Sequence, residues 1–190
     1  MKKLTMILSL VVLFAFTASA YAQTKGETQF GLNGPLFENS KPKFSGAKSG
    51  TVMSPQANVR YLVTDKIGVN VGLAILKYSG EPFKTFGIDK MGINLGLGGR
   101  YYYYAKDKMR INGGLDLDLG FGKLNESFDD KGKKVSTPMS LKITAAELEY
   151  WPMEGGAITG DLFYAMDGLN LGDNGSTGFG IGLGVKIRIK

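Results

Sequence analysis

The strictest constraint on the fold is an alternation of large apolar residues with small or charged ones over residues 178–190, GFGIGLGVKIRIK. One set of alternate positions holds only Phe, Ile, Leu and Val, and the other holds glycines followed by Lys, Arg and Lys. Side chains alternate between the two faces of a β-strand, whereas an α-helix repeats every ~3.6 residues. The segment is therefore predicted to be a β-strand with one continuous apolar face.

The same period of two recurs along the chain. It predicts further strands at 27–33, 53–63, 67–78, 91–104, 109–122, 139–150 and 158–166. The segment 139–150 changes phase, and a β-bulge near Ala145 and Ala146 would restore a single apolar face. Short connections at 64–66, 105–108 and 152–156 alternate with long polar ones at 38–51, 79–89, 123–137 and 167–177. This order is typical of eight antiparallel strands joined up and down.

The N-terminal segment has the pattern of an export signal. Two lysines precede an uncharged, mostly apolar stretch at 4–16, which is shorter than the ~18 residues of a membrane-spanning helix. Ala20-Tyr21-Ala22 then fits the small-x-small cleavage rule. We expect residues 1–22 to be a cleaved signal peptide, in preference to an N-terminal membrane anchor, and residues 23–190 to form the barrel.

The volume of the barrel decides which face points inward. An eight-stranded barrel has an interior just wide enough to be filled by side chains, so the large apolar residues would overfill it. The face of glycines and charges fits the interior, and the apolar face is expected to contact lipid. Tyr61, Tyr101, Tyr103, Tyr150 and Trp151 lie beside short connections and predict an aromatic girdle. A soluble periplasmic ligand-binding barrel, with the faces exchanged, is the less favoured alternative.

The signal peptide, the eight alternating segments and the GFGIGLGVKIRIK terminus resemble the small OmpA/OmpX-like outer-membrane β-barrels of Gram-negative bacteria. The resemblance covers residues 23–190. It implies an all-β, antiparallel, up-and-down transmembrane barrel in the outer membrane, with short periplasmic turns and long extracellular loops. It also implies contact with outer-membrane lipid, insertion by the barrel-assembly machinery and a monomeric state. Such barrels usually end on an aromatic residue that this machinery recognises, whereas this chain ends Ile189-Lys190.

Charged residues on the inward face are the most informative polar feature. The cationic ones are Arg60, Arg100, Arg110, Lys186 and Arg188, and the acidic ones are Asp116, Asp118, Glu147, Glu149 and Asp161. Three of them, Arg60, Arg100 and Glu149, each precede a tyrosine near a short turn and are expected at similar depth. We predict an interior charge network that plugs the barrel. A selectivity ring for ions is the alternative interpretation.

Composition excludes several classes of site. The chain has no Cys and no His, which removes disulfides, Ser-His-Asp triads and His-ligated zinc. The known enzymes of the resembled barrels rely on histidine, so we expect no enzymatic activity. An EF-hand starting at Asp116 fails because Gly120 and Ser127 occupy ligand positions. We predict no metal site and no cofactor, and the net charge of +6 does not suggest a nucleic-acid partner in an exported protein.

The remaining functional classes are non-enzymatic. The favoured one is a structural, membrane-stabilising or surface-binding barrel, whose loops at 38–51 and 123–137 carry lysines that would suit anionic lipopolysaccharide or a host ligand. The alternative is a small ion-conducting, porin-like pore. The soluble periplasmic barrel is third.

Overall fold

The computed structural model of the chain describes residues 25–43, 48–80, 91–121, 127–128, 134–135 and 137–189. The predicted signal peptide at 1–22 lies outside the described residues, and so do most of the connections expected at 79–89 and 123–137. Within the described part of the chain, no helix is long and apolar enough to cross a membrane.

Nine strands form one sheet. They are β1 (Thr28–Pro42), β2 (Gly50–Met53), β3 (Gln56–Leu62), β4 (Ile67–Ser79), β5 (Met91–Lys106), β6 (Met109–Phe121), β9 (Met139–Met153), β10 (Gly156–Asp167) and β11 (Ser176–Ile189). A separate short pair consists of β7 (Ser127–Phe128) and β8 (Lys134–Val135), and a 3₁₀ helix, η2, spans Leu169–Asn174.

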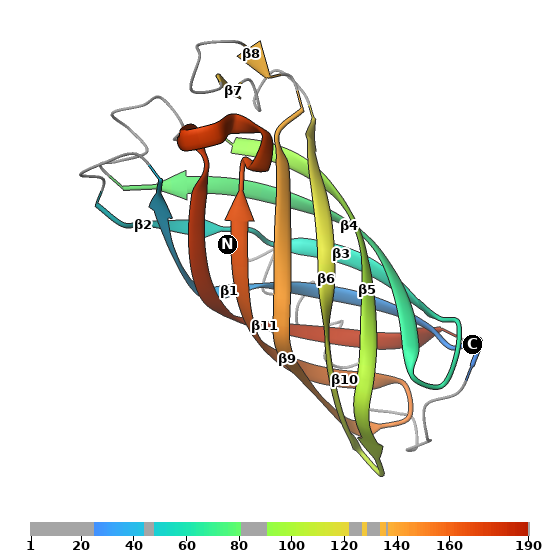
Figure 1. Cartoon of the computed structure of the whole chain (residues 1–190). Coiled ribbons are helices and arrows are strands. Elements are labelled where there is room, and N and C mark those ends of the chain that lie inside the picture. The colour runs from blue at the N-terminus through green and yellow to red at the C-terminus, as the bar shows by residue number, and fades with distance from the viewer. Residues whose placement is uncertain are drawn as a thin grey trace, which may run out of the picture.

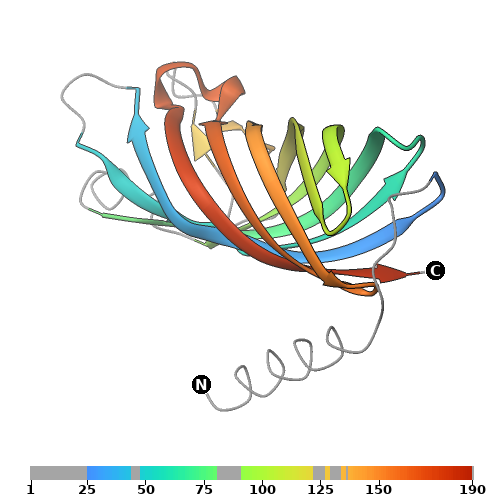
Figure 2. The same cartoon turned by 90° about the horizontal axis from the view of Figure 1, so that it is seen from below.

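The sheet closes on itself (Figures 1 and 2). Sequential strands pair antiparallel around the ring, and β11 pairs with β1 from Thr28 opposite Ile189 to Pro42 opposite Ser176. Both β2 and β3 lie between β1 and β4 and therefore share one position in the ring. The result is an eight-stranded, all-β, up-and-down barrel, which confirms the fold class predicted from the alternation.

Two strand boundaries differ from the prediction. The first strand extends to Pro42, well past the expected end at residue 33. The prediction stopped early because the C-terminal half of this strand exposes polar residues such as Lys41 and therefore lacks the apolar alternation. The expected strand at 53–63 is divided at Ser54-Pro55, where proline has no N–H to donate to the ladder. The long connection expected at 38–51 is correspondingly shorter.

The predicted bulge in the sixth strand position is present. Leu162 of β10 pairs with Ala146 of β9, but the next residue, Phe163, pairs with Thr144. Ala145 is therefore the extra residue, and it shifts the phase of β9 by one position. The bulge lets Leu141 and Leu148, which have opposite parity in the sequence, lie on the outer face of one strand.

The two ends of the barrel differ. At one end, called the turn end here, connections are short: β5 ends at Lys106 and β6 begins at Met109, and Asp107 adopts a left-handed φ of 52° to close the turn. At the opposite end, called the loop end, Figure 1 shows β7, β8 and η2 above the barrel. This asymmetry agrees with the expected alternation of short turns and long loops.

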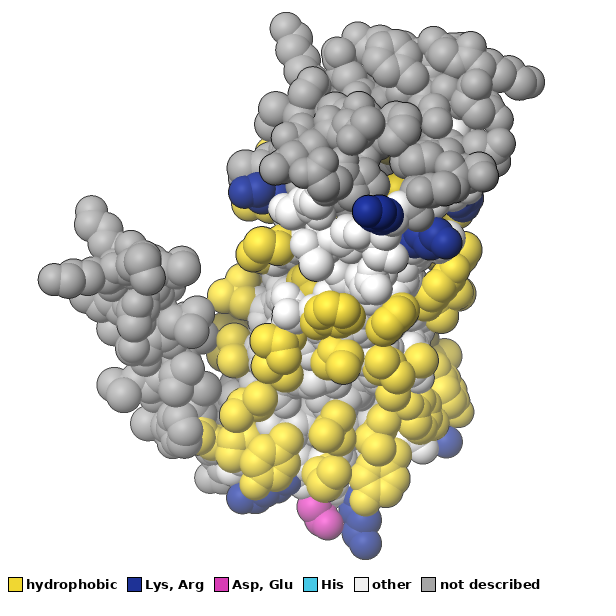
Figure 3. All heavy atoms as spheres, turned by 90° about the vertical axis from the view of Figure 1, so that its left-hand side faces the viewer, with side chains coloured by type: hydrophobic (Ala, Val, Ile, Leu, Met, Phe, Trp, Pro, Cys, Tyr) yellow, Lys and Arg dark blue, Asp and Glu magenta, His cyan; other side chains and the backbone are white. Residues whose placement is uncertain are grey.

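The outer surface is an apolar band (Figure 3). Large side chains such as Leu73, Leu97 and Ile158 are more than half exposed, at 57%, 61% and 57% of their surface. Exposed tyrosines, among them Tyr61, Tyr101, Tyr103 and Tyr150, lie near the turn end.

Trp151 does not belong to the aromatic girdle in which the sequence placed it. Only 1% of its surface is exposed, and it points into the barrel. The reason is parity, by which we mean that odd and even positions of a strand point to opposite faces. Trp151 follows the outward Tyr150 on a continuous strand, so it must face the interior.

Glycines line the interior where larger side chains cross it. Gly98 pairs with Asp116 across β5 and β6, and Gly182 pairs with Asp161 across β10 and β11. A Cβ atom on either glycine would collide with the carboxylate of its partner. The interior glycines thus leave space that the charged side chains of the neighbouring strand occupy.

Candidate functional site: the charged interior

Glu149 of β9 is the centre of the largest polar network in the described interior. Its side chain is fully buried, with 0% of the surface exposed. One carboxylate oxygen accepts hydrogen bonds from Arg60 (2.7 Å), Lys186 (2.7 Å), Tyr102 (3.0 Å) and Asn112 (3.0 Å), and the other accepts one from the indole N–H of Trp151 (3.0 Å). These donors come from β3, β11, β5, β6 and β9, so the network spans the interior.

Glu147 lies two residues away on the same face of β9 and shares the same cations. The Nη2 atom of Arg60 is 2.9 Å from one carboxylate oxygen of Glu147, and the ammonium of Lys186 pairs with the other. Each cation therefore bridges both glutamates. The four residues form a compact group of two positive and two negative charges, all at least 94% buried as side chains.

Arg100 and Asp116 extend this group along the barrel. Their side chains form a two-point ion pair, with the second contact at 3.0 Å, and the Nε atom of Arg100 lies 3.6 Å from Glu147. Asn70 joins the two parts, because its amide oxygen accepts a hydrogen bond from Arg60 at 2.6 Å and its amide nitrogen donates to Asp116 at 3.3 Å. We call Arg60, Arg100, Asp116, Glu147, Glu149 and Lys186 the central ion-pair cluster.

A second cluster closes the turn end. The carboxylate of Glu27 is 2.8 Å from Arg110 and 3.3 Å from Arg188. Both guanidinium groups also lie over the ring of Trp151, at 4.7 and 4.8 Å from its centroid. Arg188 and Arg110 repel each other, and the shared carboxylate and the electron-rich ring face compensate for this repulsion.

A third ion pair lies toward the loop end. The ammonium of Lys142 is 3.0 Å from Asp161 and 4.0 Å from the centre of the Phe163 ring. Asp118 lies nearby, but its carboxylate has no ion pair or hydrogen bond with any residue that the structure describes.

The ten residues predicted for the interior network all face the inside of the barrel, but they do not form one unit. Six make the central cluster, and Arg110 and Arg188 belong to the turn-end cluster. Asp161 pairs near the loop end, and Asp118 lines the cavity there without an ion pair to a described residue. Arg60, Arg100 and Glu149 do lie close together, although Arg100 pairs with Asp116 and Glu147 and not with Glu149.

Four charges of the described interior were not predicted from the sequence. Glu38 and Asp167, which line the interior near the loop end, were expected in long connections. The other two are Glu27 and Lys142. Glu27 immediately precedes β1, and the alternation that places Phe30 outward also places Glu27 inward. Lys142 stands between Leu141 and Ile143 on the inward face of β9. Parity applied to every charged residue of each strand could have found both.

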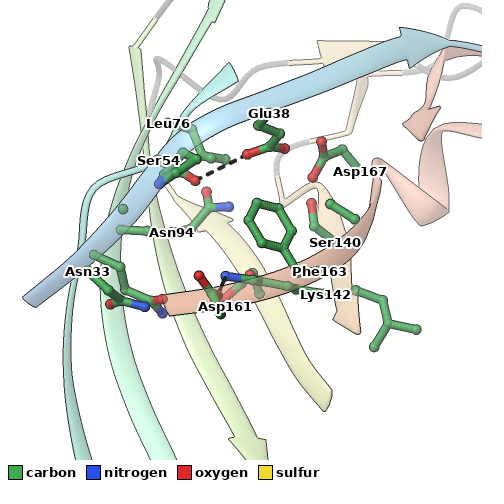
Figure 4. Close-up of a pocket in the computed structure, with 17 residues that line it drawn as sticks. Asn33, Glu38, Ser54, Leu76, Asn94, Ser140, Lys142, Asp161, Phe163 and Asp167 are labelled. Atoms are coloured by element: carbon green, nitrogen blue, oxygen red, sulfur yellow. Dashed lines mark hydrogen bonds and ion pairs between the residues drawn. The ribbon is translucent and has the colours of Figure 1, made fainter. Parts of the chain in front are cut away.

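A cavity of about 40 Å³ lies between the central cluster and the loop end (Figure 4). Its described lining includes Glu38, Ser54, Ser140 and Asp118, together with the Lys142 group. A cavity of this size has room for about three waters. Among the described residues, no group of three acidic side chains is placed to hold a metal ion.

Known structures share this fold. The chain is similar to Neisserial surface protein A (TM-score 0.59, 15% identity, covering 90% of this chain and 99% of that one). It is also similar to the N-terminal β-barrel domain of OprF from Pseudomonas aeruginosa (TM-score 0.51, 16% identity, covering 88% and 100%). Both are outer-membrane β-barrels, and at these identities the likeness concerns the fold. The sequence matches no protein-family model, and no curated protein matches it.

Proposed function

We propose that this chain is a non-enzymatic β-barrel of the outer membrane of a Gram-negative bacterium, with an interior closed by ion pairs. The observation that carries the proposal is the combination of a lipid-compatible outer surface with a buried, internally paired charge network. A soluble barrel would bury its apolar face and hydrate its charges. Here the distribution is the reverse, which favours a membrane barrel.

The geometry of the central cluster supports a closed interior. Arg60 and Lys186 reach from β3 and β11 to the same two glutamates on β9, so side chains from separate parts of the ring meet inside it. Burying these charges unpaired would be costly, whereas paired and hydrogen-bonded charges are tolerated. An ion crossing this level would have to displace several of these pairs, which favours a plug over a pore.

The role that fits a plugged barrel is structural or membrane-stabilising, with binding through the loop end. Lys41, Lys43 and Lys48 are exposed there and would suit phosphate groups of lipopolysaccharide. The barrel would act as a monomer among outer-membrane lipids, after insertion by the barrel-assembly machinery. The absence of His from the whole sequence supports a non-enzymatic role, since enzymes of similar barrels rely on that residue.

The plug is tested by recording from the purified protein in a planar lipid bilayer. We expect no steady conductance from the natural sequence, with a protein-free detergent addition as the control. A stable, ion-selective current that changes its selectivity in Glu149→Lys would contradict the plug and establish the porin-like alternative. The variant Asp65→Lys, in a turn outside the interior, is the matched control because it reverses one negative charge in the same way.

A further inference from the structure

The loop-side cavity is lined by more carboxyl groups than cationic groups. Its described lining holds four carboxylates, Glu38, Asp118, Asp161 and Asp167, and one cationic side chain, Lys142. Lys142 forms an ion pair with Asp161, and Asp167 accepts a hydrogen bond from Ser176. Glu38 and Asp118 form no ion pair with any described residue. The central cluster below the cavity is balanced by comparison, with three cations and three anions. Carboxylates gathered in a cavity with low-dielectric walls attract small cations.

Several polar groups of this cavity lack protein partners. The side chain of Ser140 lines the cavity in a residue that is only 7% exposed, yet its hydroxyl has no hydrogen bond to any described residue. Glu38 is 4% exposed and accepts one long hydrogen bond, 3.5 Å, from Ser54. Figure 4 shows Glu38 and Ser140 around the same space. Buried polar groups in proteins nearly always have a partner, so this set indicates that something else supplies the hydrogen bonds.

Lys142 shows which chemistry the cavity accepts. Its ammonium is held by one carboxylate, 3.0 Å away in Asp161, and by the face of one aromatic ring, 4.0 Å away in Phe163. This combination is the one that recognises alkylammonium ions. Glu38 and Asp118 line the same cavity without an ion-pair partner among the described residues. An ammonium ion can donate three separate hydrogen bonds to such dispersed acceptors, whereas a metal ion needs converging ligands that the described residues do not provide.

We propose that the loop-side cavity binds a small organic cation through a protonated primary amine. The ammonium group would lie against Glu38, Asp118 and Ser140, next to Lys142, and its tail would point toward the loop end. The central cluster lies on the other side of the cavity, so the ligand enters and leaves by the loop end. This inference goes beyond the structural role proposed above, and binding in detergent micelles neither requires nor tests a membrane function.

The probe is butylammonium, which reproduces the side chain of Lys142 from Cβ to the ammonium group. It is titrated into the folded protein in a zwitterionic detergent, and amide chemical shifts are followed by NMR. We expect saturable shifts at Ser140, Phe163 and Asp118, and none at the turn residues near Asp65. Neutral n-butanol is the matched ligand control. Equal shifts with n-butanol, or shifts spread over the outer apolar band, would overturn the proposal.

Two variants test the assignment of residues. Glu38→Gln and Asp118→Asn keep the size of each side chain but remove its charge, and each should weaken binding about tenfold, because hydrogen bonds to charged groups are the strong ones. Asp65→Asn removes one charge at the turn end and should leave the affinity unchanged. Folding of each variant is checked by the mobility of unheated samples on a denaturing gel. Unchanged affinity in both folded cavity variants, or displacement of butylammonium by equimolar Ca²⁺, would refute an amine site.

Discussion

At the scale of single residues, the central cluster makes Glu149 the most sensitive charge in the described interior. Glu149→Leu would leave Arg60 and Lys186 sharing one glutamate, so a confined cation loses its partner. Removing one member of a buried ion pair costs about 3–5 kcal/mol. We expect a loss of that order in the free energy of unfolding, measured by urea titration of the protein in lipid vesicles.

A second substitution identifies the partner of Glu149. Adding Lys186→Met should recover part of the loss, because the remaining Arg60 and Glu147 still form a complete pair at 2.9 Å. Adding Arg100→Leu should not recover it, because Arg100 pairs with Asp116. Recovery with Arg100→Leu and not with Lys186→Met would show that the pairing of the central cluster is wrong.

Interior glycines give a second prediction at this scale. Gly98→Ala would place a Cβ atom against the carboxylate of Asp116 and 2.5 Å from the backbone oxygen of Leu115, which cannot move freely. Overpacking of this kind costs about 1–3 kcal/mol. Gly160→Ala is the matched control, because its nearest neighbours are 3.8 and 3.9 Å away, an ordinary contact distance. Equal urea midpoints for the two variants would contradict the tight packing of the glycine face.

At the scale of strands, the direction of each face is testable with a single charge. Leu95→Arg places a guanidinium on the outer face of β5, where arginine at the bilayer midplane costs about 2–4 kcal/mol. Thr51→Arg adds the same charge to an exposed position near the loop end of β2, where the cost falls toward zero. We expect a much lower folded fraction in vesicles for Leu95→Arg. Similar folded fractions would mean that this face does not contact lipid.

The strands also show how far sequence reasoning reaches. Parity predicted the strands with apolar outer faces and even the bulge at Ala145, because the lipid-facing pattern is local. It failed in the outer half of β1 and at Pro55, where the outer face becomes polar or the ladder is interrupted.

The pairing inside the barrel was less accessible than the strands. Parity showed that Arg60 and Glu149 face inward, but their contact joins β3 to β9, which are not neighbours in the sheet. Such contacts depend on the stagger of the closed ring and on side-chain length, neither of which is written in a local pattern. Trp151 illustrates the same limit. Its position next to Tyr150 suggested that it belongs to the aromatic girdle, whereas the alternation of side chains along the strand places it inside the barrel.

At the scale of the whole molecule, the decisive feature is that the last strand pairs with the first. Phe30 of β1 lies directly opposite Ile187 of β11, and facing residues on antiparallel strands have Cβ atoms about 4.5–5.5 Å apart. The natural sequence has no cysteine, so a pair introduced at these two positions is the only one present. We expect Phe30→Cys with Ile187→Cys to form a disulfide on mild oxidation of the folded protein in vesicles, seen as a reduction-sensitive change in gel mobility.

Phe30→Cys with Leu183→Cys is the control, because Leu183 pairs with Gly34. Leu183 therefore lies about 13 Å further along the β1–β11 pairing, four residues at about 3.3 Å each. An open sheet would leave both pairs unlinked, and a slipped register would link the control pair first, so the experiment separates a closed barrel in this register from either alternative.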